Sequence, residues 1–458
     1  MRKIRFIARL TLKAASRSRS IMASAGTVLA CTCGLPWLIK HNGTAPMFAQ
    51  VHLTYGLLLL AILLSATALL MACGSLSQDI ETGRIQLVAV KPVSRWKIWA
   101  GKWVGIMMIN AGLLIAGAGA LYLLIQWRAR QLVPEEQVRL HQNVLIARGS
   151  AEEPPVDLEK DVERLFQRRR QQPNVAQLEP DFVRAQIRDE IRAQQETVPA
   201  GFRRVWKVPL NGREGLVQSG PTSIRVRFHS ARLTEQAPMD TVWIVGDRNH
   251  PEHWRGILPL TPGVAHEFPV SARAINPDGT LSIECENRSQ STLLFRLSDP
   301  LELLFPEGGF LLNYVRSGII LYCWLGLLTA VGLTASSFLG FPVAILLSLC
   351  FLAVAVSSDT YAEVIRDGTV SGVDHETGKS NRDLLDWILV PLSQVLLLIA
   401  EPVSQHSPIE PISNGRSIPW TSVGDAFVRL DLISGFLIAA IGCLALHRRD
   451  LSKTGGAS

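Results

Sequence analysis

The chain has 458 residues, of which 48% are hydrophobic, and a formal net charge of +7. The apolar residues gather in the first and last thirds, while residues 128–314 have the composition of a soluble protein, so a single globular domain is excluded. Six of the seven cysteines lie in or beside the apolar runs, which excludes a disulfide framework and a zinc-binding pattern.

Long apolar runs predict six membrane-spanning helices, because about 20 apolar residues cross a hydrocarbon core about 30 Å thick. The sixth qualifies if Arg429 and Asp431 sit at its outer end and reach toward the headgroups. A further run at 384–400 is shorter and contains Pro391, and we expect it to be re-entrant or interfacial, within an external segment at about 359–425. The predicted spans are 21–39, 52–73, 104–126, 317–337, 341–357 and 427–446.

The positions of Lys and Arg predict the orientation, since cytoplasmic segments of membrane proteins are enriched in both. The first 20 residues hold seven of them and no acid, and the segment 76–103 holds five. We therefore expect both termini and 76–103 in the cytoplasm, residues 128–314 outside, and a location in the plasma (inner) membrane. A full crossing at 384–400 is the alternative, and it would place the basic tail outside. The basic excess thus reflects topology and does not indicate a nucleic-acid partner.

The segment 76–103 is the longest predicted cytoplasmic feature between spans. It is punctuated at Thr82-Gly83 and Lys91-Pro92, and Ser94 is a predicted N-cap for a helix that enters the third span. A basic loop without a partner would explain its charge. It would not explain why an ordered loop of this length stands here while "TASSFLGF", which links the fourth and fifth spans, is so short.

The external segment divides into two predicted parts. Residues 128–202 are rich in Glu, Arg and Gln, and the spacing of Val183, Ile187 and Ile191 predicts helices. Residues 203–314 contain short alternating or β-branched runs separated by turn residues, such as "NPDG" at 276–279, which predicts a β-sandwich of six to eight strands. The predicted fold class is an α-helical polytopic membrane protein with an inserted α+β domain, flanked by membrane parts at 1–127 and 315–458.

One stretch of the external segment has the spacing of a metal site. Asp247, His250 and His253 stand three residues apart, and such side chains can coordinate zinc. They fall in a predicted turn, where Asn, His and Pro are ordinary surface residues. We interpret them as a surface turn and expect no metal.

Another stretch, "GVDHETGKS" at 372–380, resembles a phosphate-binding loop. That motif needs four residues between its first glycine and the Gly-Lys pair, and here five separate Gly372 from Gly378. No predicted strand precedes it. We interpret it as a polar external loop, and we expect neither a cofactor, an ATPase nor a catalytic residue in this chain.

The segment 76–103 resembles the cytoplasmic loop of type-two ABC exporter permeases. That pattern has acidic residues shortly before a glycine, then leucines, a proline followed by Ser-Arg, and a Gly-Lys that opens the third span. Lys91 departs from the small or hydroxyl residue of the family pattern. The basic N-terminal helix, the six spans and the Arg-Arg-Asp-Leu ending agree with the same family over roughly 1–127 and 315–455. The matching residues are Asp79, Glu81, Gly83, Leu87, Pro92, Ser94, Arg95, Gly101 and Lys102.

The resemblance implies a permease subunit with no catalytic role. Two such subunits, identical or different, pair with two separate ABC ATP-binding subunits, which dock on 76–103 and drive export. The matching residues would form that coupling contact, with Glu81, Gly83, Pro92 and Arg95 at its centre. We expect membrane lipid around the spans and a protein or ligand on the β-sandwich.

Two other functions fit parts of the sequence. A membrane-anchored binding or scaffold protein would use its β-sandwich without transport and would tolerate charge reversal in 76–103. A membrane enzyme would use Asp247, His250 and His253. Asn110 and Gln126 are polar residues within spans, where they either line a path or bond to a neighbouring helix.

Overall fold

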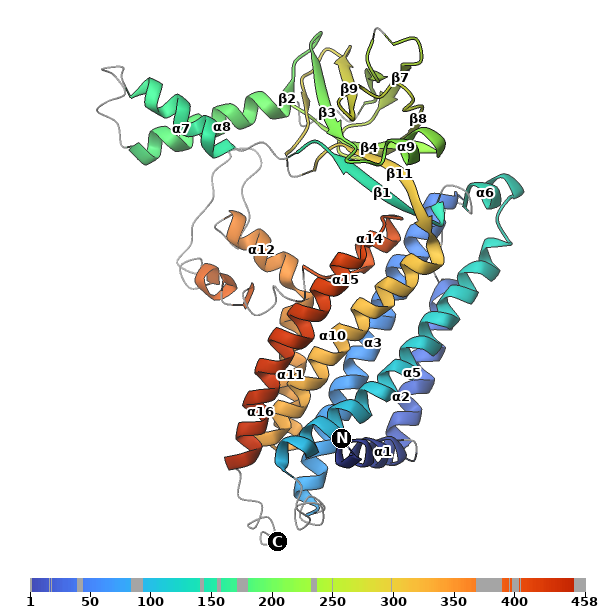
Figure 1. The fold of residues 1–458 in the computed structure, drawn as a ribbon, viewed down its shortest axis with the longest axis vertical. Coiled ribbons are helices and arrows are strands. Elements are labelled where there is room, and N and C mark those ends of the chain that lie inside the picture. The colour runs from blue at the N-terminus through green and yellow to red at the C-terminus, as the bar shows by residue number, and fades with distance from the viewer. Residues whose placement is uncertain are drawn as a thin grey trace. The chain divides into compact units, whose positions relative to one another are not determined.

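The computed structural model describes residues 2–15, 17, 19–38, 44–83, 94–140, 144–154, 158–170, 180–231, 237–248, 250–297, 299–367, 389–394, 396–397, 403 and 405–448. The chain forms two compact units. The membrane unit comprises Met1–Leu145 and Gly309–Ser458, and the β-rich unit comprises Ile146–Gly308. In Figure 1 the first is a bundle of long helices and the second a set of short strands with a helical hairpin.

The membrane unit consists mainly of helices, joined by turns and short loops in its described residues. The last of its helices is one continuous run, Trp420–Arg448, in which a π-helical segment joins two α-helical ones. The elements are α1 (Arg2–Ala15), α2 (Arg19–Leu38), α3 (Ala45–Glu81), α5 (Arg95–Ala129), α6 (Pro134–Arg139), α10 (Phe310–Phe338), α11 (Phe341–Val356), α12 (Ser358–Asp367), α14 (Ile409–Ser413), α15 (Trp420–Ala426), η2 (Phe427–Gly435) and α16 (Phe436–Arg448).

Four helices are long and apolar enough to cross a membrane. They are Met47–Glu81, Arg95–Ala129, Phe310–Phe338 and Trp420–Arg448, and they confirm the second, third, fourth and sixth predicted spans as long apolar helices. The first and fifth are helical too, but their apolar helices, Met22–Gly34 and Phe341–Val356, are shorter. The protein is thus multi-pass with four candidate spans, and six crossings stay a prediction.

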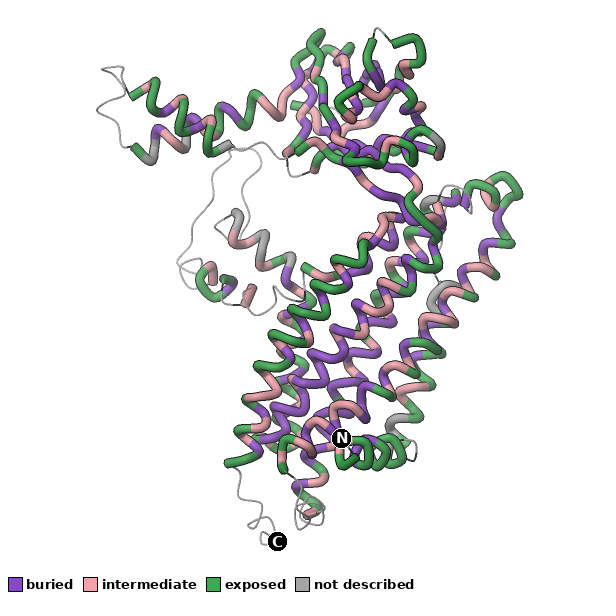
Figure 2. Tube along the Cα trace, viewed as in Figure 1, coloured by how far each residue is buried: buried purple, intermediate pink, exposed green. Residues whose placement is uncertain are grey.

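Helices α3 and α10 form the buried centre of the bundle (Figure 2). Gly332 of α10 lies so close to α3 that a Cβ there would come within 2.8 Å of the Cβ of Ala72. Small residues permit this approach, and close van der Waals packing stabilises helix pairs where lipid removes the hydrophobic driving force. α5 and the last helix surround this centre and expose apolar side chains such as Ile115 and Phe436.

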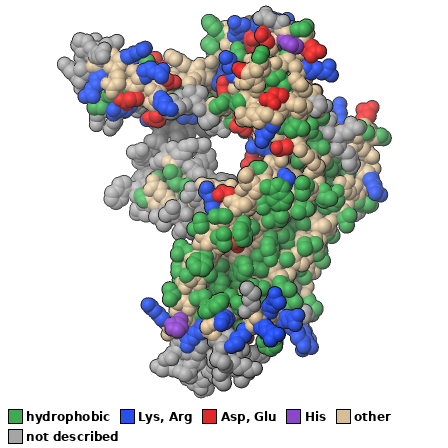
Figure 3. Space-filling view, in the orientation of Figure 1, with side chains coloured by type: hydrophobic (Ala, Val, Ile, Leu, Met, Phe, Trp, Pro, Cys, Tyr) green, Lys and Arg blue, Asp and Glu red, His purple; other side chains and the backbone are tan. Residues whose placement is uncertain are grey.

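One end of the bundle is basic. It holds α1, the C-terminal end of α3, the start of α5 and the C-terminal end of α16 (Figure 1). Lys and Arg side chains gather there (Figure 3), and α1 alone carries Arg2, Lys3, Arg5, Arg9 and Lys13. This clustering agrees with the orientation that the sequence predicts.

The β-rich unit contains strands from both predicted external parts. Its strands are β1 (Ile146–Glu152), β2 (Thr197–Val198), β3 (Arg203–Pro209), β4 (Thr222–Arg227), β5 (His229–Ser230), β6 (Met239–Val245), β7 (Trp254–Leu260), β8 (Ala265–Val270), β9 (Thr280–Asn287), β10 (Leu293–Leu294) and β11 (Glu302–Gly309). They form three sheets, ordered β1-β11-β4-β8, β2-β10-β5 and β3-β9-β6-β7. The turn predicted at 276–279 is present, with Gly279 at φ +74°.

The two four-stranded sheets contribute side chains to one buried core. Trp206 of β3 and Trp243 of β6 stack with ring centroids 5.9 Å apart, and Phe268 of β8 lies 5.5 Å from Trp243. The prediction of a β-rich region with alternating strands is therefore confirmed, as three antiparallel sheets. The strand count is higher than expected, and β1 and β2 lie in 128–202, where only helices were predicted. β1, "IARGSAE", lacks β-branched enrichment and is a strand because its neighbours supply the pairing.

The remaining helices of this unit are α7 (Leu158–Arg169), α8 (Pro180–Glu196) and α9 (Glu214–Ser219). α7 and α8 pair through a small apolar core that includes Val183, Ile187 and Ile191, so the predicted helical spacing is confirmed. Arg184 lies over the ring of Phe166, 4.2 Å from its centroid, and closes this core.

Candidate functional site

The described part of the segment 76–103 consists of the end of one long helix and the start of another. α3 ends at Glu81, and Gly83 adopts φ +68° while its N–H bonds to the Ile80 carbonyl at 3.2 Å. This left-handed conformation suits glycine, so the predicted break at Thr82-Gly83 is confirmed. α5 begins at Arg95, and Ser94 occupies its N-cap position without a side-chain capping bond. Leu87 and Pro92 lie outside the described residues.

A buried ion pair joins these two helices. The Lys102 Nζ donates to Asp79 Oδ2 and to the Ser75 carbonyl, each at 2.6 Å. The Lys102 side chain is 7% exposed, and the Asp79 side chain is 34% exposed. The lysine is therefore buried inside the bundle, while the carboxylate is partly open to solvent. The sequence marked both residues for the same site, and the structure brings them together. The structure also shows that the backbone carbonyl of Ser75 accepts a hydrogen bond from Lys102. Every residue has such a carbonyl, so the sequence gives no sign of this contact.

Glu81, at the end of α3, faces the start of α11. The backbone N–H of Phe341 points to Glu81 Oε1 at 3.5 Å. A carboxylate is favourable there, because the first N–H groups of a helix lack intrahelical partners and carry a partial positive charge. The sequence predicts the short turn that links α10 and α11. This helix pair thus contacts the segment 76–103 near the segment's N-terminal boundary.

Arg95, at the start of α5, holds the end of α16. Its Nη1 donates to the carbonyls of Leu446 and His447, both at 2.6 Å. These are orphan carbonyls of the last helical turn, where a cation is favoured by the helix dipole. The last helix is therefore tied to the other boundary of the segment.

Gly101 and Gly105 let the N-terminal helix α1 lie against α5. A Cβ at Gly101 would come within 2.7 Å of the Ile7 Cβ, and one at Gly105 within 2.7 Å of the Thr11 Cβ. Ile7 and Ala8 are buried in this contact. The sequence marked Gly101 but not Gly105, although glycines four apart on an apolar helix are the recurring signal for close helix contact.

Part of the site remains open to a partner. Glu81, Thr82, Ser94 and Trp96 are exposed, and Lys97 lies over the Trp96 ring, 5.4 Å from its centroid. Among the described residues of the segment, Asp79, Glu81, Arg95 and Lys102 contact other helices. A force applied to its exposed surface would therefore reach α1, α3, α5, α11 and α16 through direct contacts.

The predicted metal-site spacing forms a turn. The His250 N–H bonds to the Asp247 carbonyl at 2.9 Å, and His253 Nδ1 lies 2.8 Å from the His250 carbonyl. Within the described ranges, no group of three or more His, Cys, Asp or Glu side chains is placed to hold a metal ion. The stretch 372–380 lies outside those ranges.

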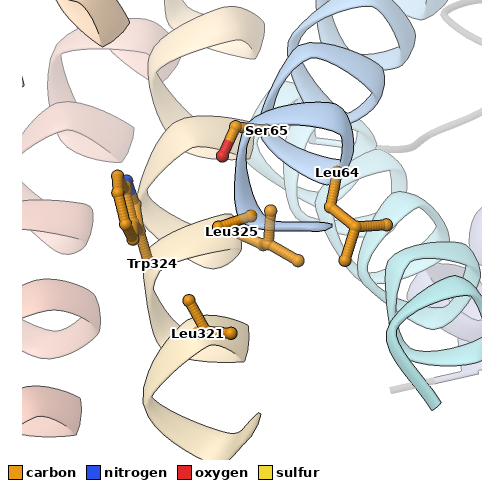
Figure 4. A pocket seen from close by; sticks show the side chains of 6 residues that line it. Leu64, Ser65, Leu321, Trp324 and Leu325 are labelled. Carbon is orange, nitrogen blue, oxygen red and sulfur yellow. The ribbon is translucent and has the colours of Figure 1, made fainter. Parts of the chain in front are cut away.

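A small apolar hollow lies between α3 and α10 (Figure 4). Ala61, Leu64, Leu321 and Leu325 line it, and Ser65 and Trp324 supply its polar atoms. With no charged group in its wall, it offers no chemistry of its own.

The sequence of the site matches a known family. Residues 7–137 match the family model described as ABC-2 family transporter protein. Neither a curated protein nor a solved structure matches the chain. The matched range contains most of α1, the whole segment 76–103 and α5, and it ends before the β-rich unit. The resemblance expected from the sequence is therefore confirmed for the part of the chain that carries the motif.

Proposed function

We propose that this chain, an ABC-2 transporter membrane protein by residues 7–137, is a permease subunit of an ABC exporter driven by a separate ATP-binding subunit. The observation that supports it is the set of contacts that charged residues of 76–103 make with other helices. Asp79, Glu81, Arg95 and Lys102 bind other helices, while Ser94 and Trp96 are exposed. ATP hydrolysis belongs to the partner, and the chain itself transmits motion.

The mechanism follows from these contacts. When the ATP-binding subunits close, they displace the exposed surface near Ser94. Lys102–Asp79 carries that displacement to α3, Glu81 to α11 and Arg95 to α16. A ligand shifts a conformational equilibrium only through contacts that differ between the two states. The three ties are therefore the contacts that we expect to change during the cycle.

The proposed topology has six crossings, with both termini and 76–103 in the cytoplasm and the β-rich unit outside the inner membrane. The Lys and Arg side chains at one end of the bundle support it. A second permease subunit completes the transporter, and lipid surrounds it. The β-rich unit docks an external protein or ligand.

The test is a cross-link at Ser94. All seven native cysteines are replaced, and Ser94→Cys is introduced because this side chain is exposed and makes no capping bond. Membranes that also hold a co-expressed ABC ATP-binding subunit are treated with a bifunctional thiol reagent. We expect a cross-link to that ATPase that weakens when MgATP is added. Thr421→Cys, exposed at the start of the last helix, is the matched control and should give none.

A membrane-anchored scaffold is the second candidate. It is favoured by the size of the β-rich unit, which is compact and lies beyond the range that matches the family. Glu81→Lys discriminates the two functions. It places a cation beside the α11 N-terminus and on the exposed surface, so it should abolish ATPase association in the transporter and leave a scaffold functional. Arg448→Glu, a charge reversal outside 76–103 on the same end, is its control.

A further inference from the structure

An acidic residue lies inside the membrane unit, on the π-helical segment η2. Asp431 Oδ1 lies against Gly326, which is near the middle of the candidate span α10, so the carboxyl group lies well inside the membrane unit. π-Helical segments are rare, and they occur frequently at functional sites. Ionisable residues at this depth are rare as well and commonly mark substrate or ion pathways.

The residues next to Asp431 belong to α10, and Trp103 of α5 contacts one of them, Gly326. A Cβ at Gly326 would overlap Asp431 Oδ1, so the absence of a side chain there makes room for the carboxylate. The Cys323 thiol lies at hydrogen-bonding distance, and Tyr322 lies close enough to feel the charge. Trp103 of α5 donates its Nε1–H to the Gly326 carbonyl at 3.0 Å. Asp431, Tyr322 and Trp103 are all half-buried, so a ligand can reach them.

This carboxylate differs from the other acid of the same helix. Asp425 accepts from Arg429 at 2.9 Å and lies 2.9 Å from His406 Nε2. For Asp431, no ion pair with Lys, Arg or His occurs among the residues that the structure describes. A carboxylate in a medium of low dielectric is strongly disfavoured without a positive partner. A positive charge from outside the chain would therefore stabilise the ionised form of Asp431.

We propose that Asp431, with the aromatic rings of Tyr322 and Trp103, binds an organic cation with an apolar body. The carboxylate neutralises the charge, and aromatic faces attract cations through their quadrupoles. The apolar surroundings favour a ligand that partitions into lipid. This assignment rests on the proposed function, where it gives the class of cargo, but binding itself needs neither ATP nor the ATPase.

Equilibrium binding to the purified full-length chain tests it. The probe is radiolabelled tetraphenylphosphonium, and tetraphenylborate, of equal size and opposite charge, is its counterpart. Wild type should prefer the cation. Asp431→Asn should weaken cation binding by about tenfold, as the loss of a charged contact implies. Asp425→Asn removes a carboxylate that already has partners and should leave binding unchanged.

Two further measurements keep the test independent of folding. Gly326→Ala retains the acid but displaces its carboxylate, and it should weaken cation binding in the same direction. In the wild-type chain, the cation should protect Asp431 from a hydrophobic carbodiimide and leave Asp425 unprotected. Equal affinity for both probes, unchanged binding in Asp431→Asn, or no protection would each overturn the proposal. Because no ATPase is present, such a failure would leave the coupling role of 76–103 standing.

Discussion

Two fully buried asparagines, one in each unit, have opposite surroundings. Asn287 in β9 donates to the carbonyls of Val198 and Ser291 at 2.9 Å and accepts from the N–H and hydroxyl of Ser289. Asn110 in α5 has no hydrogen-bond partner for either amide atom among the described residues. Asn287 therefore stabilises the core of the β-rich unit through hydrogen bonds to three other residues. Asn110 adds nothing to this conformation of the bundle, which is the behaviour expected of a part that rearranges.

The same contrast applies to charged groups. In the β-rich unit, Glu267 belongs to a surface network with Arg148, Arg225 and Ser223. In the membrane unit, Lys102 has one ion-pair partner among the described residues and is almost completely buried. Removal of one charge should therefore cost more in the bundle than on the sheet surface, because water cannot replace the lost partner as well.

The largest effect is expected for Asn287→Leu. The change removes the amide that bonds the Val198 and Ser291 carbonyls and the Ser289 N–H and hydroxyl, although this hydroxyl and the Ser291 carbonyl still bond to each other. Buried groups that lose a partner are costly, so we expect a loss of about 3 kcal/mol from the free energy of unfolding of the β-rich unit. Hydrogen exchange of peptides from β3 and β9 measures it in the full chain. If Asn287→Leu left the hydrogen exchange of these peptides unchanged, Asn287 would not stabilise the β-rich unit, and the proposed difference from Asn110 would be wrong.

Lys102→Met comes next. It keeps the length of the side chain but leaves Asp79 without its cation, and since Asp79 is partly exposed we expect a loss of about 2 kcal/mol in bundle stability. Coupled ATPase activity should also fall, because α3 and α5 lose their tie. Lys97→Met is the matched control, since Lys97 lies over Trp96 at the surface and should change stability little. Equal effects of both variants would contradict the structural role of Lys102.

Glu267→Gln gives a smaller, pH-dependent effect. Burial alone would raise the pKa of Glu267, but the guanidinium groups of Arg148 and Arg225 outweigh it and hold the pKa below its ordinary value. A lowered folded-state pKa stabilises the fold above the unfolded pKa, and this contribution is lost as the pH falls through the folded pKa. At pH 7 the variant should be less stable by about 1 kcal/mol, given the solvent exposure of the pair.

The difference between wild type and Glu267→Gln should then shrink below about pH 4, where the free carboxyl begins to bind protons. Thermal melts of the full chain across this range, followed by tryptophan fluorescence, check it. A gap that stays constant down to low pH would show that the carboxylate charge is not responsible.

The smallest effect is expected for Asn110→Leu, the same substitution as in the β-rich unit. Removing an amide without partners should leave the bundle equally stable or stabilise it by up to about 1 kcal/mol. Proteolytic resistance of the purified protein measures it. A marked destabilisation would mean that Asn110 is bonded in the folded protein, and the contrast with Asn287 would fail.

Hydropathy and alternation predicted the long helices, the β-rich region and the helical spacing in α8, because each depends on local periodicity. Which residues of 76–103 meet was predictable only in part. The family pattern marked Asp79 and Lys102, yet their partner Ser75 and the carbonyls bound by Arg95 are backbone atoms that no residue type reveals.

The π-helical segment was not predicted either. A π-helical segment changes which side chains lie on each face of a helix. The last helix is apolar on most of its faces, so its sequence has no polar face from which this change could be recognised. Asp431 was expected at the outer end of the last span, reaching toward the headgroups. It lies instead over Gly326, because a glycine at that level of α10 leaves space for it inside the bundle.

The proposed function depends most directly on one prediction, that 76–103 faces the cytoplasm, where the ATP-binding subunits are. In intact cells and in inverted membrane vesicles, Ser94→Cys on the cysteine-free background is treated with a thiol reagent that cannot cross the bilayer. The account predicts labelling of Ser94→Cys in inverted vesicles only, and of Thr421→Cys in intact cells only. Labelling of Ser94→Cys in intact cells would contradict it.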